Sequence, residues 1–386
     1  MHITIYCQYV WGMGHLFRSL ELARAFEPHP VTVLAGGQPV DIDLPAHVEM
    51  VRLPTLFMDE KFTQLISGEP DRDVDSVKKE RLEILRQHFA TQPPDVFIIE
   101  LFPFGRTAFR FELVPILENI RQGIYGTVRT VCSLRDILVE KKDPDAYEQR
   151  VIGLLQQYFD LLMIHSDERL LPLSKTFRRE GDIEIPVVYT GFITRQPAPR
   201  RVAALKEQLG LPDPVKLIVA SAGGGRSGFP LLEPVVQAFG RLDSAIDFHL
   251  EVFTGPFIPP QAYDALEAMA AGRIRVRRFS GDFLEYLALA DLSISLAGYN
   301  TCMNLLVTGV PSLILPYRRQ REQPLRVDAL RAYLPLHVLA PSDLEPGRLA
   351  RRVLDALSEP RPFSRVPLNL DGAETAAAYI VQWMQA

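Results

Sequence analysis

Short apolar runs alternate with amphipathic segments along the whole chain. The runs are nearly continuous in their apolarity, which is typical of parallel strands that helices cover on both faces. Strands of this kind separated by helical segments predict βαβ units. In the first half, helices are expected at Leu16–Phe26 and Val77–Phe89. The strands expected there are Ile3–Cys7, Val31–Ala35, Val96–Leu101, Thr130–Leu134, Leu161–His165 and Val187–Thr190.

The alternation stops at a polar, proline-rich segment, residues 196–201, and then restarts. Such a segment favours an interdomain linker. The strands expected beyond it are Lys216–Ser221, His249–Thr254, Ile274–Phe279, Leu292–Leu296, Ser312–Tyr317 and His337–Ala340. The helices expected there are Leu231–Leu242, Tyr263–Ala271, Asn300–Thr308, Leu325–Tyr333, Leu344–Leu357 and a last amphipathic segment, Ala373–Met384.

These patterns predict an α/β protein with two Rossmann-like domains whose parallel sheets face each other across a cleft. A chain of 386 residues exceeds the size at which one core usually keeps growing, which also favours two domains. We expect an N-terminal domain at residues 1–195, a linker at 196–201 and a C-terminal domain at 202–370. Residues 371–386 are expected to form a helix that packs back on the N-terminal domain. A cleft of this kind suits a reaction of two substrates away from water.

The composition of the chain indicates which binding partners and which cellular compartment to expect. The net charge is −5, which argues against nucleic acid as the main partner. The three cysteines lie in or beside apolar runs, as expected of reduced thiols in a cytosolic protein. The chain enters a strand almost at once, so we expect no signal peptide, and no apolar run reaches the roughly 20 residues of a spanning helix. We expect a cytoplasmic protein, and peripheral contact with the inner membrane surface is compatible with this composition.

A glycine turn with a histidine follows the first expected strand. Gly12 and Gly14 flank Met13, and His15 opens the next helix. Glycines there allow close backbone approach to a ligand, and the N–H groups at a helix start can bind an anion or a hydroxyl. The positive end of the helix dipole favours a neutral His15 that can accept a proton. The alternative interpretation is a plain strand-to-helix turn with a capping histidine.

The same turn departs from the dinucleotide-binding fingerprint. Phe17 stands where that fingerprint has its third glycine. The strand expected at Val31–Ala35 ends at Gly36 rather than at an acidic residue for a ribose. A dehydrogenase that uses a nicotinamide or flavin cofactor is therefore disfavoured, and we expect no cofactor.

A second glycine loop follows the first expected strand of the second half. The loop reads Ser221-Ala222-Gly223-Gly224-Gly225-Arg226-Ser227-Gly228. Its glycines can form a nest of N–H groups for a diphosphate, with Arg226 and Ser227 as side-chain donors. The loop lacks the Gly-Lys-Ser/Thr ending of a P-loop, so ATP hydrolysis is not supported. The alternative interpretation is a flexible surface loop.

Polar side chains also follow the expected strands Leu292–Leu296 and Ser312–Tyr317. In a parallel sheet, ligands lie outside the carboxyl ends of the strands. Carboxylates and amides suit sugar or ribose hydroxyls because they can make paired hydrogen bonds. Alternatively, Asn300 and Thr301 only cap their helix. The polar residues are Gly298, Tyr299, Asn300, Thr301 and Asn304 at one helix start, and Glu322 and Gln323 in the next loop.

Arg135 and Asp136 end a buried strand of the first half, at the same rim as His15. They are candidates for acceptor binding or catalysis, or they pair with each other and do nothing more. Asp71 and Asp73 form an Asp-x-Asp pattern in a polar loop rather than at a buried strand end. We therefore expect no metal site, and no cluster of His or Cys residues has ligand spacing elsewhere.

Taken together, these motifs resemble the GT-B glycosyltransferases of the MurG-like class, which includes the peptidoglycan N-acetylglucosaminyltransferase. The resemblance lies in a Gly-x-Gly-His-Leu-x-Arg-Ser-Leu opening and a Gly-Tyr-Asn-Thr motif. Here these are Gly12 to Leu20, with Arg18 in place, and Gly298 to Thr301. The match extends over nearly the whole chain.

The resemblance implies two Rossmann-like domains, a nucleotide-diphosphate sugar held by the C-terminal one, and no metal. The turn from Phe279 to Phe283 would lie against the base, and the loop at Gly223 would hold the diphosphate. Glu322 and Gln323 would bind hydroxyls of the donor sugar. His15 would act at the reacting centre, with Gly12, Gly14 and Arg18 on the acceptor side.

One departure from that class concerns the ribose. Where these transferases usually have a glutamate on the donor helix, this chain has Asn304. A neutral amide gives roughly half the hydrogen-bond strength of a carboxylate. We expect an inverting transfer from a UDP-type donor, perhaps UDP-GlcNAc, to a hydroxyl acceptor, with a lipid-linked precursor as candidate and either His15 or Asp136 as base. The alternatives are a nucleotide-sugar hydrolase or epimerase, and a non-catalytic protein that binds nucleotide sugars.

Overall fold

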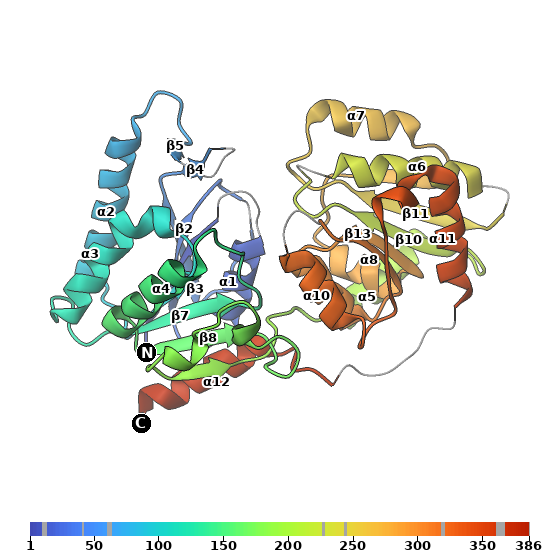
Figure 1. Cartoon of the computed structure of the whole chain (residues 1–386). Coiled ribbons are helices and arrows are strands. Elements are labelled where there is room, and N and C mark those ends of the chain that lie inside the picture. Colours follow the sequence, from blue (N-terminus) through green and yellow to red (C-terminus); the bar gives the residue numbers. More distant parts are fainter. Residues whose placement is uncertain are drawn as a thin grey trace. The chain divides into compact units, whose positions relative to one another are not determined.

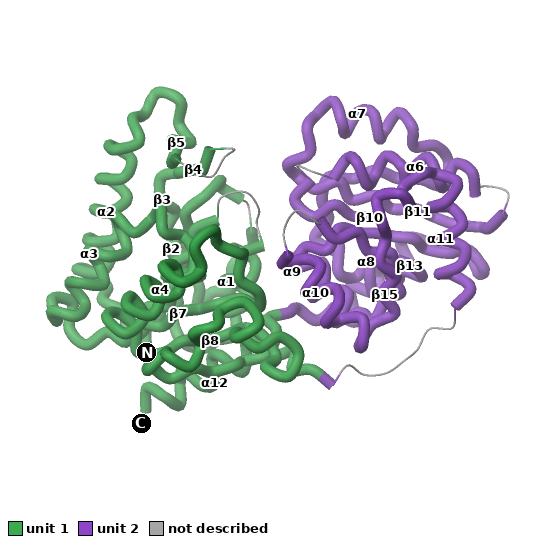
Figure 2. The backbone as a smooth tube through the Cα atoms, in the orientation of Figure 1, with its two compact units in different colours: residues 1–193, 368–386 green, residues 194–367 purple. Residues whose placement is uncertain are grey.

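The computed structural model describes residues 1–9, 14–40, 42–59, 64–225, 228–242, 245–317, 321–359 and 367–385. It divides the chain into two compact units (Figure 2). Unit 1 consists of Met1–Ile193 together with Leu368–Ala386, and unit 2 of Thr194–Pro367. The sequence pattern had placed these boundaries at residues 195 and 370.

Unit 1 is built on a seven-stranded sheet in the order β3-β2-β1-β6-β7-β8-β9. All neighbouring strands in it run parallel. A separate antiparallel pair, β4 with β5, follows β3 in the chain. The strands are β1 (Ile3–Gln8), β2 (Val31–Gly36), β3 (Val48–Leu53), β4 (Leu56–Met58), β5 (Leu65–Ser67), β6 (Val96–Glu100), β7 (Arg129–Arg135), β8 (Leu161–His165) and β9 (Val187–Tyr189).

Helices cover both faces of this sheet (Figure 1). On one face, α1 and the C-terminal α12 pack on a core that contains Ile5, Leu20 and Ile380. On the other, α2, α3 and α4 pack on a core that contains Phe97 and Leu155. The helices are α1 (Gly14–Arg24), α2 (Val74–Thr91), α3 (Arg110–Arg121), α4 (Pro144–Tyr158) and α12 (Gly372–Gln385), with short 3-10 turns at Thr107–Phe109, Leu173–Lys175 and Glu180–Asp182.

Side-chain caps define where two of these helices begin. The carboxylate of Asp73 accepts a hydrogen bond from Ser76 N at the start of α2, so the second aspartate of the Asp-x-Asp pattern is a helix cap. Asp143 caps α4 in the same way, and Pro144 follows it at the first helical position. The sequence pattern predicted helical segments between the strands without giving bounds for α3 and α4, although Asp143-Pro144 is a recognisable start signal, and it missed the edge strand β3.

A buried ion pair fixes the carboxyl end of β1, the strand that leads to His15. Arg81 and Glu112 are both fully buried, and Arg81 Nη2 lies 2.6 Å from Glu112 Oε1. Arg81 Nη2 also donates to Gln8 Oε1 over 2.7 Å, and Tyr6 donates its hydroxyl hydrogen to Glu112. The pair therefore joins α2 and α3 to the last residues of β1.

Unit 2 has a six-stranded parallel sheet in the order β12-β11-β10-β13-β14-β15. Its strands are β10 (Lys216–Ser221), β11 (Phe248–Phe253), β12 (Ile274–Arg277), β13 (Leu292–Leu296), β14 (Ser312–Leu315) and β15 (Leu336–Val338). Four of the expected strands end one or two residues earlier than predicted, and as a result Phe279 and Tyr317 lie beyond β12 and β14.

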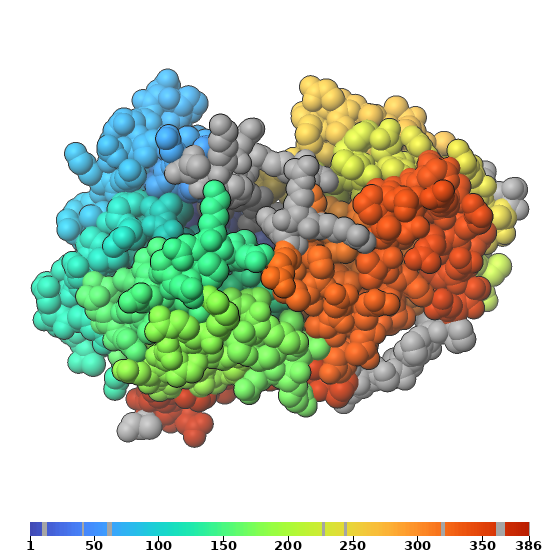
Figure 3. All heavy atoms as spheres, in the orientation of Figure 1, coloured from blue at the N-terminus to red at the C-terminus, as the bar shows by residue number. Residues whose placement is uncertain are grey.

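The helices of unit 2 follow the βαβ order. On one face, α6 and α11 pack on a core that contains Ile218, Leu232 and Val353. The space-filling view shows the outer surface of α6, α7 and α11 in yellow to red (Figure 3). The helices are α5 (Pro199–Leu209), α6 (Phe229–Leu242), α7 (Pro260–Met269), α8 (Phe283–Leu289), α9 (Tyr299–Thr308), α10 (Glu322–Leu330) and α11 (Pro346–Ser358), with a 3-10 turn at Pro341–Leu344.

The expected linker at 196–201 is partly wrong. Residues 199–201 form the first turn of α5, because Pro199 has the fixed backbone angle of a first helical residue and needs no N–H there. Among the described residues, no helix is long and apolar enough to cross a membrane.

Candidate functional site

His15 and Glu100 form the centre of the polar cluster in unit 1. His15 is the second residue of α1, directly beyond the glycine turn, and Glu100 is the last residue of β6, the neighbour of β1 in the sheet. Their closest atoms, His15 Nδ1 and Glu100 Oε1, are 2.7 Å apart. The His15 side chain is 20% exposed, whereas that of Glu100 is 1% exposed. The pair is therefore a buried carboxylate behind a partly accessible imidazole.

The protonation of this pair follows from its geometry. An ionised carboxylate only accepts hydrogen bonds, so Nδ1 of His15 carries the proton and Nε2 keeps its lone pair. Burial lowers the pKa of His15 to about 3, against the opposing effect of Glu100, and the charges of Arg106 and Arg18 lower it further. His15 is therefore neutral near physiological pH, with Nε2 free to accept a proton.

Glu100 is held as an anion. Burial alone would raise its pKa, but His15, Arg18 and Arg106 together outweigh burial and lower the pKa. Arg18, whose side chain is 4% exposed, forms an ion pair with Glu100 Oε1. Arg18 thus lies buried behind the pair, and its expected role on the acceptor side stays a prediction.

Glu100 was not among the residues proposed from the sequence. The signal was present, because a glutamate interrupts the apolar run that begins at Val96. A carboxylate at the carboxyl end of a buried strand needs a partner. Gly12 lies outside the described residues, and Gly14 is the first residue of α1.

Arg135 is the last residue of β7, two strands away from β1 in the sheet, and Asp136 follows it. Asp136 is 1% exposed, and its Oδ1 accepts a hydrogen bond from Ile137 N over 2.8 Å. A carboxylate enclosed in this way and bonded to its own backbone is poorly placed to reach a substrate proton. Of the two bases considered from the sequence, the geometry favours His15.

A second hydrogen-bonded chain lies along the same edge of the sheet. His165 at the end of β8 is fully buried, with Nε2 2.8 Å from Ser133 Oγ and Nδ1 2.8 Å from Thr190 Oγ1. Burial lowers the pKa of His165 to about 3. Ser133 pairs with Glu100 across β6 and β7, so this chain adjoins the His15–Glu100 pair.

The glycine loop of unit 2 follows β10, and its shape requires glycine. Gly223 and Gly225 have φ of +60° and +94°. A Cβ at Gly225 would lie 2.4 Å from the carbonyl oxygen of Thr254 at the end of β11. Gly223 and Gly224 are exposed, and their N–H groups donate to no described residue. Arg226 and Ser227 lie outside the described residues.

Two buried hydroxyls beside this loop lack partners. Ser221 ends β10 and pairs in register with Ser295 of β13. Their side-chain oxygens are buried and have no hydrogen-bond partner among the described residues. A buried hydroxyl without a partner is costly, and it often marks a missing ligand or water.

The start of α9 adds further donors to this edge. Gly298 is the N-cap residue, and no side chain caps the helix there. The interpretation in which Asn300 and Thr301 act as caps is therefore wrong, and the first N–H groups of α9 remain available to an anion. Asn304 lies one turn further and is partly buried.

Glu322 and Gln323 occupy the first turn of α10 rather than a loop. Glu322 Oε1 accepts a hydrogen bond from Arg326 Nη2 over 2.9 Å, and Arg326 is fully buried. The Arg326 guanidinium lies over the Tyr299 ring, 5.3 Å from its centroid. Gln323 Oε1 accepts from Tyr317 N over 2.8 Å. Arg326, which was not proposed from the sequence, thus links Glu322 of α10 with Tyr299 of α9.

The segment from Phe279 to Phe283 combines an exposed aromatic ring with an anchored backbone. Phe279 is 59% exposed, whereas the Phe283 ring packs edge-on against Phe253 at 5.2 Å. Phe283 is therefore a packing residue, and Phe279 is the ring available to a flat ligand.

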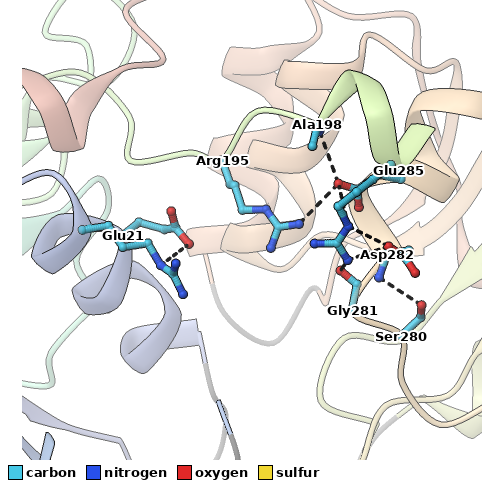
Figure 4. Close-up of polar contacts among 9 residues, drawn as sticks. Glu21, Arg195, Ala198, Ser280, Gly281, Asp282 and Glu285 are labelled. Carbon is cyan, nitrogen blue, oxygen red and sulfur yellow. Dashed lines mark hydrogen bonds and ion pairs between the residues drawn. The ribbon is translucent and has the colours of Figure 1, made fainter. Parts of the chain in front are cut away.

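Two arginines fix this segment to the chain before and within α5 (Figure 4). Arg201 Nε donates to Asp282 Oδ1 over 2.9 Å. Arg195 Nη2 lies 3.4 Å from Oε1 of the fully buried Glu285. Arg201 thus fixes the turn itself, and Arg195 fixes α8 directly after it to the segment through which the chain enters unit 2.

Solved structures place this architecture in a known class. The glycotransferase of kitacinnamycin aligns over 100% of this chain and 99% of its own, with a TM-score of 0.61 and 17% identity. The calicheamicin glycosyltransferase CalG4 aligns over 100% and 97%, with a TM-score of 0.60 and 17% identity. The chain has the GT-B fold. This confirms the fold predicted from the sequence. MurG of Acinetobacter baumannii aligns with this GT-B chain at a TM-score of 0.55 and 14% identity, over 100% and 99% of the two chains.

Sequence comparisons identify relatives of this GT-B chain over part of its length. Residues 223–376 match the C-terminal domain of glycosyltransferase family 28. The UDP-N-acetylglucosamine–N-acetylmuramyl-(pentapeptide) pyrophosphoryl-undecaprenol N-acetylglucosamine transferase of Caldicellulosiruptor saccharolyticus is 26% identical over 54% of this chain and 54% of its own length. The enzyme of the same name from Leuconostoc mesenteroides is 23% identical over 61% and 73%. The matched regions thus span about half to three quarters of these two relatives.

Proposed function

We propose that this protein is a glycosyltransferase that moves a sugar from a nucleotide-diphosphate sugar to a hydroxyl of an acceptor. Unit 2 would hold the donor, and unit 1 would supply the base. The observation that carries the proposal is the His15–Glu100 pair, a neutral imidazole with a free Nε2 backed by a buried carboxylate 2.7 Å from its Nδ1. This is the arrangement that general-base chemistry on a hydroxyl requires.

The proton and the electron pairs balance in a single displacement. His15 Nε2 takes the proton of the acceptor hydroxyl while the oxygen bonds to the anomeric carbon of the sugar. The bond from that carbon to the diphosphate breaks, and its electron pair leaves with the diphosphate. Glu100 stabilises the imidazolium that forms, and Arg18 keeps Glu100 ionised. A single displacement inverts the anomeric centre.

The leaving diphosphate would be stabilised by the donors at the carboxyl edge of the sheet in unit 2. These are the N–H groups of Gly223 and Gly224, the start of α9, and the unpartnered hydroxyls of Ser221 and Ser295. Such preorganised donors act where negative charge develops. We expect them to suffice without a metal ion. Among the described residues, no group of three His, Cys, Asp or Glu side chains is placed to hold one.

For the donor, we propose a UDP-sugar, with UDP-N-acetylglucosamine first. The support is the match of residues 223–376 and the names of the partly aligned relatives. Phe279 would stack on the base, and Glu322 and Gln323 would bind sugar hydroxyls. Asn304 would contact the ribose more weakly than a carboxylate does. For the acceptor, we propose a lipid-linked hydroxyl compound met at the inner membrane surface.

Calorimetric titration with UDP, and with GDP and TDP in parallel, tests the donor half. We expect UDP to bind most tightly. Gln323→Ala should leave the affinity for UDP unchanged and lower the affinity for UDP-N-acetylglucosamine, because the proposed contact of Gln323 is to the sugar. His15→Ala should bind UDP like the wild type. If no nucleoside diphosphate binds the folded protein at millimolar concentration, the proposal is wrong.

Release of UDP separates the transferase from the alternatives. A transferase releases UDP only when an acceptor is present, whereas a hydrolase releases it in water alone. Donor binding with no turnover across a panel of acceptors would favour a protein that binds nucleotide sugars without reacting them. Asn304 is the residue that gives this second possibility its support.

A further inference from the structure

Arg106 is an enclosed cation without a partner. It lies in the loop between β6 and α3 and is partly buried. Its Nε is buried and has no hydrogen-bond partner, and the guanidinium forms no ion pair with any described residue. A guanidinium has five donors, so an enclosed one is normally bonded to a carboxylate, a phosphate or several carbonyl groups. No described residue is bonded to Arg106 in this way.

The backbone around Arg106 is held in an unfavourable conformation. Arg106 has φ of +57° and Leu101 has φ of +67°, and these are the non-glycine residues with positive φ in the described chain. Both lie within the six residues that follow Glu100. Each such residue costs on the order of 1 kcal/mol, and such residues gather at functional sites. The loop that contains both residues leaves Arg106 close enough to Glu100 for their charges to interact.

Glu100 is the nearby carboxylate. Burial lowers the pKa of Arg106, and the charge of Glu100 opposes this effect. The two side chains are not bonded, and Glu100 Oε2 is itself buried without a hydrogen-bond partner among the described residues. Glu100 is already bonded to His15 and paired with Arg18. The charge of Arg106 nonetheless acts on both His15 and Glu100, since it lowers the pKa of each. Arg106 therefore lies close enough to the reacting pair for their charges to interact, yet no described residue forms a hydrogen bond with its Nε.

Further cations line the same side of unit 1. Arg135 lies close enough to Arg106 that its charge lowers the pKa of Arg106. Lys141 and Arg150 lie 5.4 Å and 5.8 Å from the centroid of the Tyr147 ring. The Tyr147 hydroxyl donates to the carbonyl oxygen of Phe104, two residues before Arg106, over 2.7 Å. These cations thus lie near one another on unit 1, and Arg106 and Arg18 are the ones whose positive charges act on His15.

We propose that Arg106 binds an anionic group, a phosphate or a carboxylate, on the acceptor, next to the hydroxyl that His15 deprotonates. This inference rests on the proposed transferase function and specifies the chemical class of its acceptor. Arg106 touches the substrate in this arrangement, and Arg135 contributes charge from β7. An anion bound there would orient the acceptor hydroxyl towards Nε2 of His15 and would stabilise the imidazolium formed in the reaction.

The test is an NMR titration of the imidazole of His15 in the whole chain, assigned with His15→Gln. The protein is first saturated with UDP, so that the donor site in unit 2 is occupied. Inorganic phosphate is then added, and acetate in a parallel series. We expect phosphate to shift the His15 signals and to raise the pKa of His15 by about one unit or more. A response to phosphate alone would indicate a phosphorylated acceptor, and a response to both would indicate a site that also accepts carboxylates.

Variants separate a binding role from a structural one. Arg106→Gln should lower the apparent affinity for phosphate, measured from the His15 signals, at least about tenfold. Arg106→Lys should retain part of this affinity. Arg110→Gln, an exposed arginine four residues further on, is the matched control and should leave the response unchanged. If Arg106→Gln fails to fold, the titrations of the wild type and of Arg106→Lys still show whether an anion binds at Arg106.

Three outcomes would overturn the inference. One is a His15 resonance that phosphate and acetate leave unmoved. Another is an equal phosphate response in folded Arg106→Gln. The third is a response that appears only without UDP, which would make the anion the diphosphate of the donor. If UDP itself does not bind, the titration is run without it: the donor assignment then falls, whereas an Arg106-dependent response would keep the anion site.

Discussion

The carboxyl edges of the two sheets differ in how their buried polar groups are satisfied. In unit 1, most of these groups are bonded to one another: His15 and Arg18 with Glu100, and His165 with Ser133 and Thr190. Glu100 Oε2 and Arg106 Nε are exceptions. In unit 2, the hydroxyls of Ser221 and Ser295 have no partner, and the N–H groups of the glycine loop are exposed. An edge bonded within itself holds a reactive group in one protonation state. An edge with unused donors is suited to a ligand that supplies many acceptors, such as a diphosphate.

The largest effect on catalysis is expected from substitutions in the His15–Glu100 pair of unit 1. Glu100→Gln removes the anion that orients His15 and stabilises its protonated form, so the turnover number should fall by roughly 10²- to 10⁴-fold. His15→Gln should lose a similar factor. UDP affinity should stay unchanged in both variants, as measured by calorimetry. A Glu100→Gln enzyme with wild-type turnover would show that His15 does not act as the base.

The second prediction concerns the acid stability of unit 1. His165 is buried as a neutral ring with a pKa of about 3, whereas an unfolded histidine titrates near about 6.5. The unfolded state then binds more protons, so the free energy of unfolding falls as the pH drops below about 6.5, by about 1.4 kcal/mol per pH unit. Urea unfolding at several pH values measures this slope.

The control for that slope is His165→Gln, which removes the titrating group. It should be less stable at neutral pH because the bonds to Ser133 and Thr190 are altered, and its stability should depend less on pH. An unchanged pH dependence in the variant would assign the acid sensitivity to other buried histidines, such as His88, whose pKa burial lowers to about 4.

The third prediction tests the unused donors of unit 2. Ser221→Ala and Ser295→Ala should each weaken UDP binding by about 1 kcal/mol, roughly fivefold, because each removes one hydrogen bond to the diphosphate. Ser293→Ala is the matched control. Its hydroxyl is also buried without a partner, but it lies near the amino end of β13, away from the proposed site. Equal losses in all three variants would indicate a packing effect rather than a contact with the ligand.

The predictability of the two edges also differs. The strands were predicted closely, because short continuous apolar runs such as Leu161–His165 are typical of buried parallel strands. The glycine loop was recognised by its composition. The contacts were not predictable. Glu100 and His15 are 85 residues apart in the chain, and only the register of β1 with β6 brings them together. Arg326 looked like an ordinary helical arginine, and its burial against Tyr299 depends on how α9 and α10 pack.

The smallest expected effect concerns the anchoring of the exposed Phe279. Arg201 is 47% exposed and pairs with Asp282, so the pair contributes at most about 1 kcal/mol to stability. Arg201→Ala should therefore leave the melting temperature nearly unchanged. It should also loosen the turn that carries Phe279 and weaken the binding of UDP about two- to threefold. The binding of pyrophosphate, which lacks a base, should stay unchanged. Asp282→Asn should have a smaller effect in the same direction, because Arg201 keeps its hydrogen bond to the carbonyl oxygen of Gly281. The double variant should be no worse than Arg201→Ala, which already removes the contact with Asp282. Equal weakening of pyrophosphate would mean that Arg201 acts on the diphosphate and not through the base.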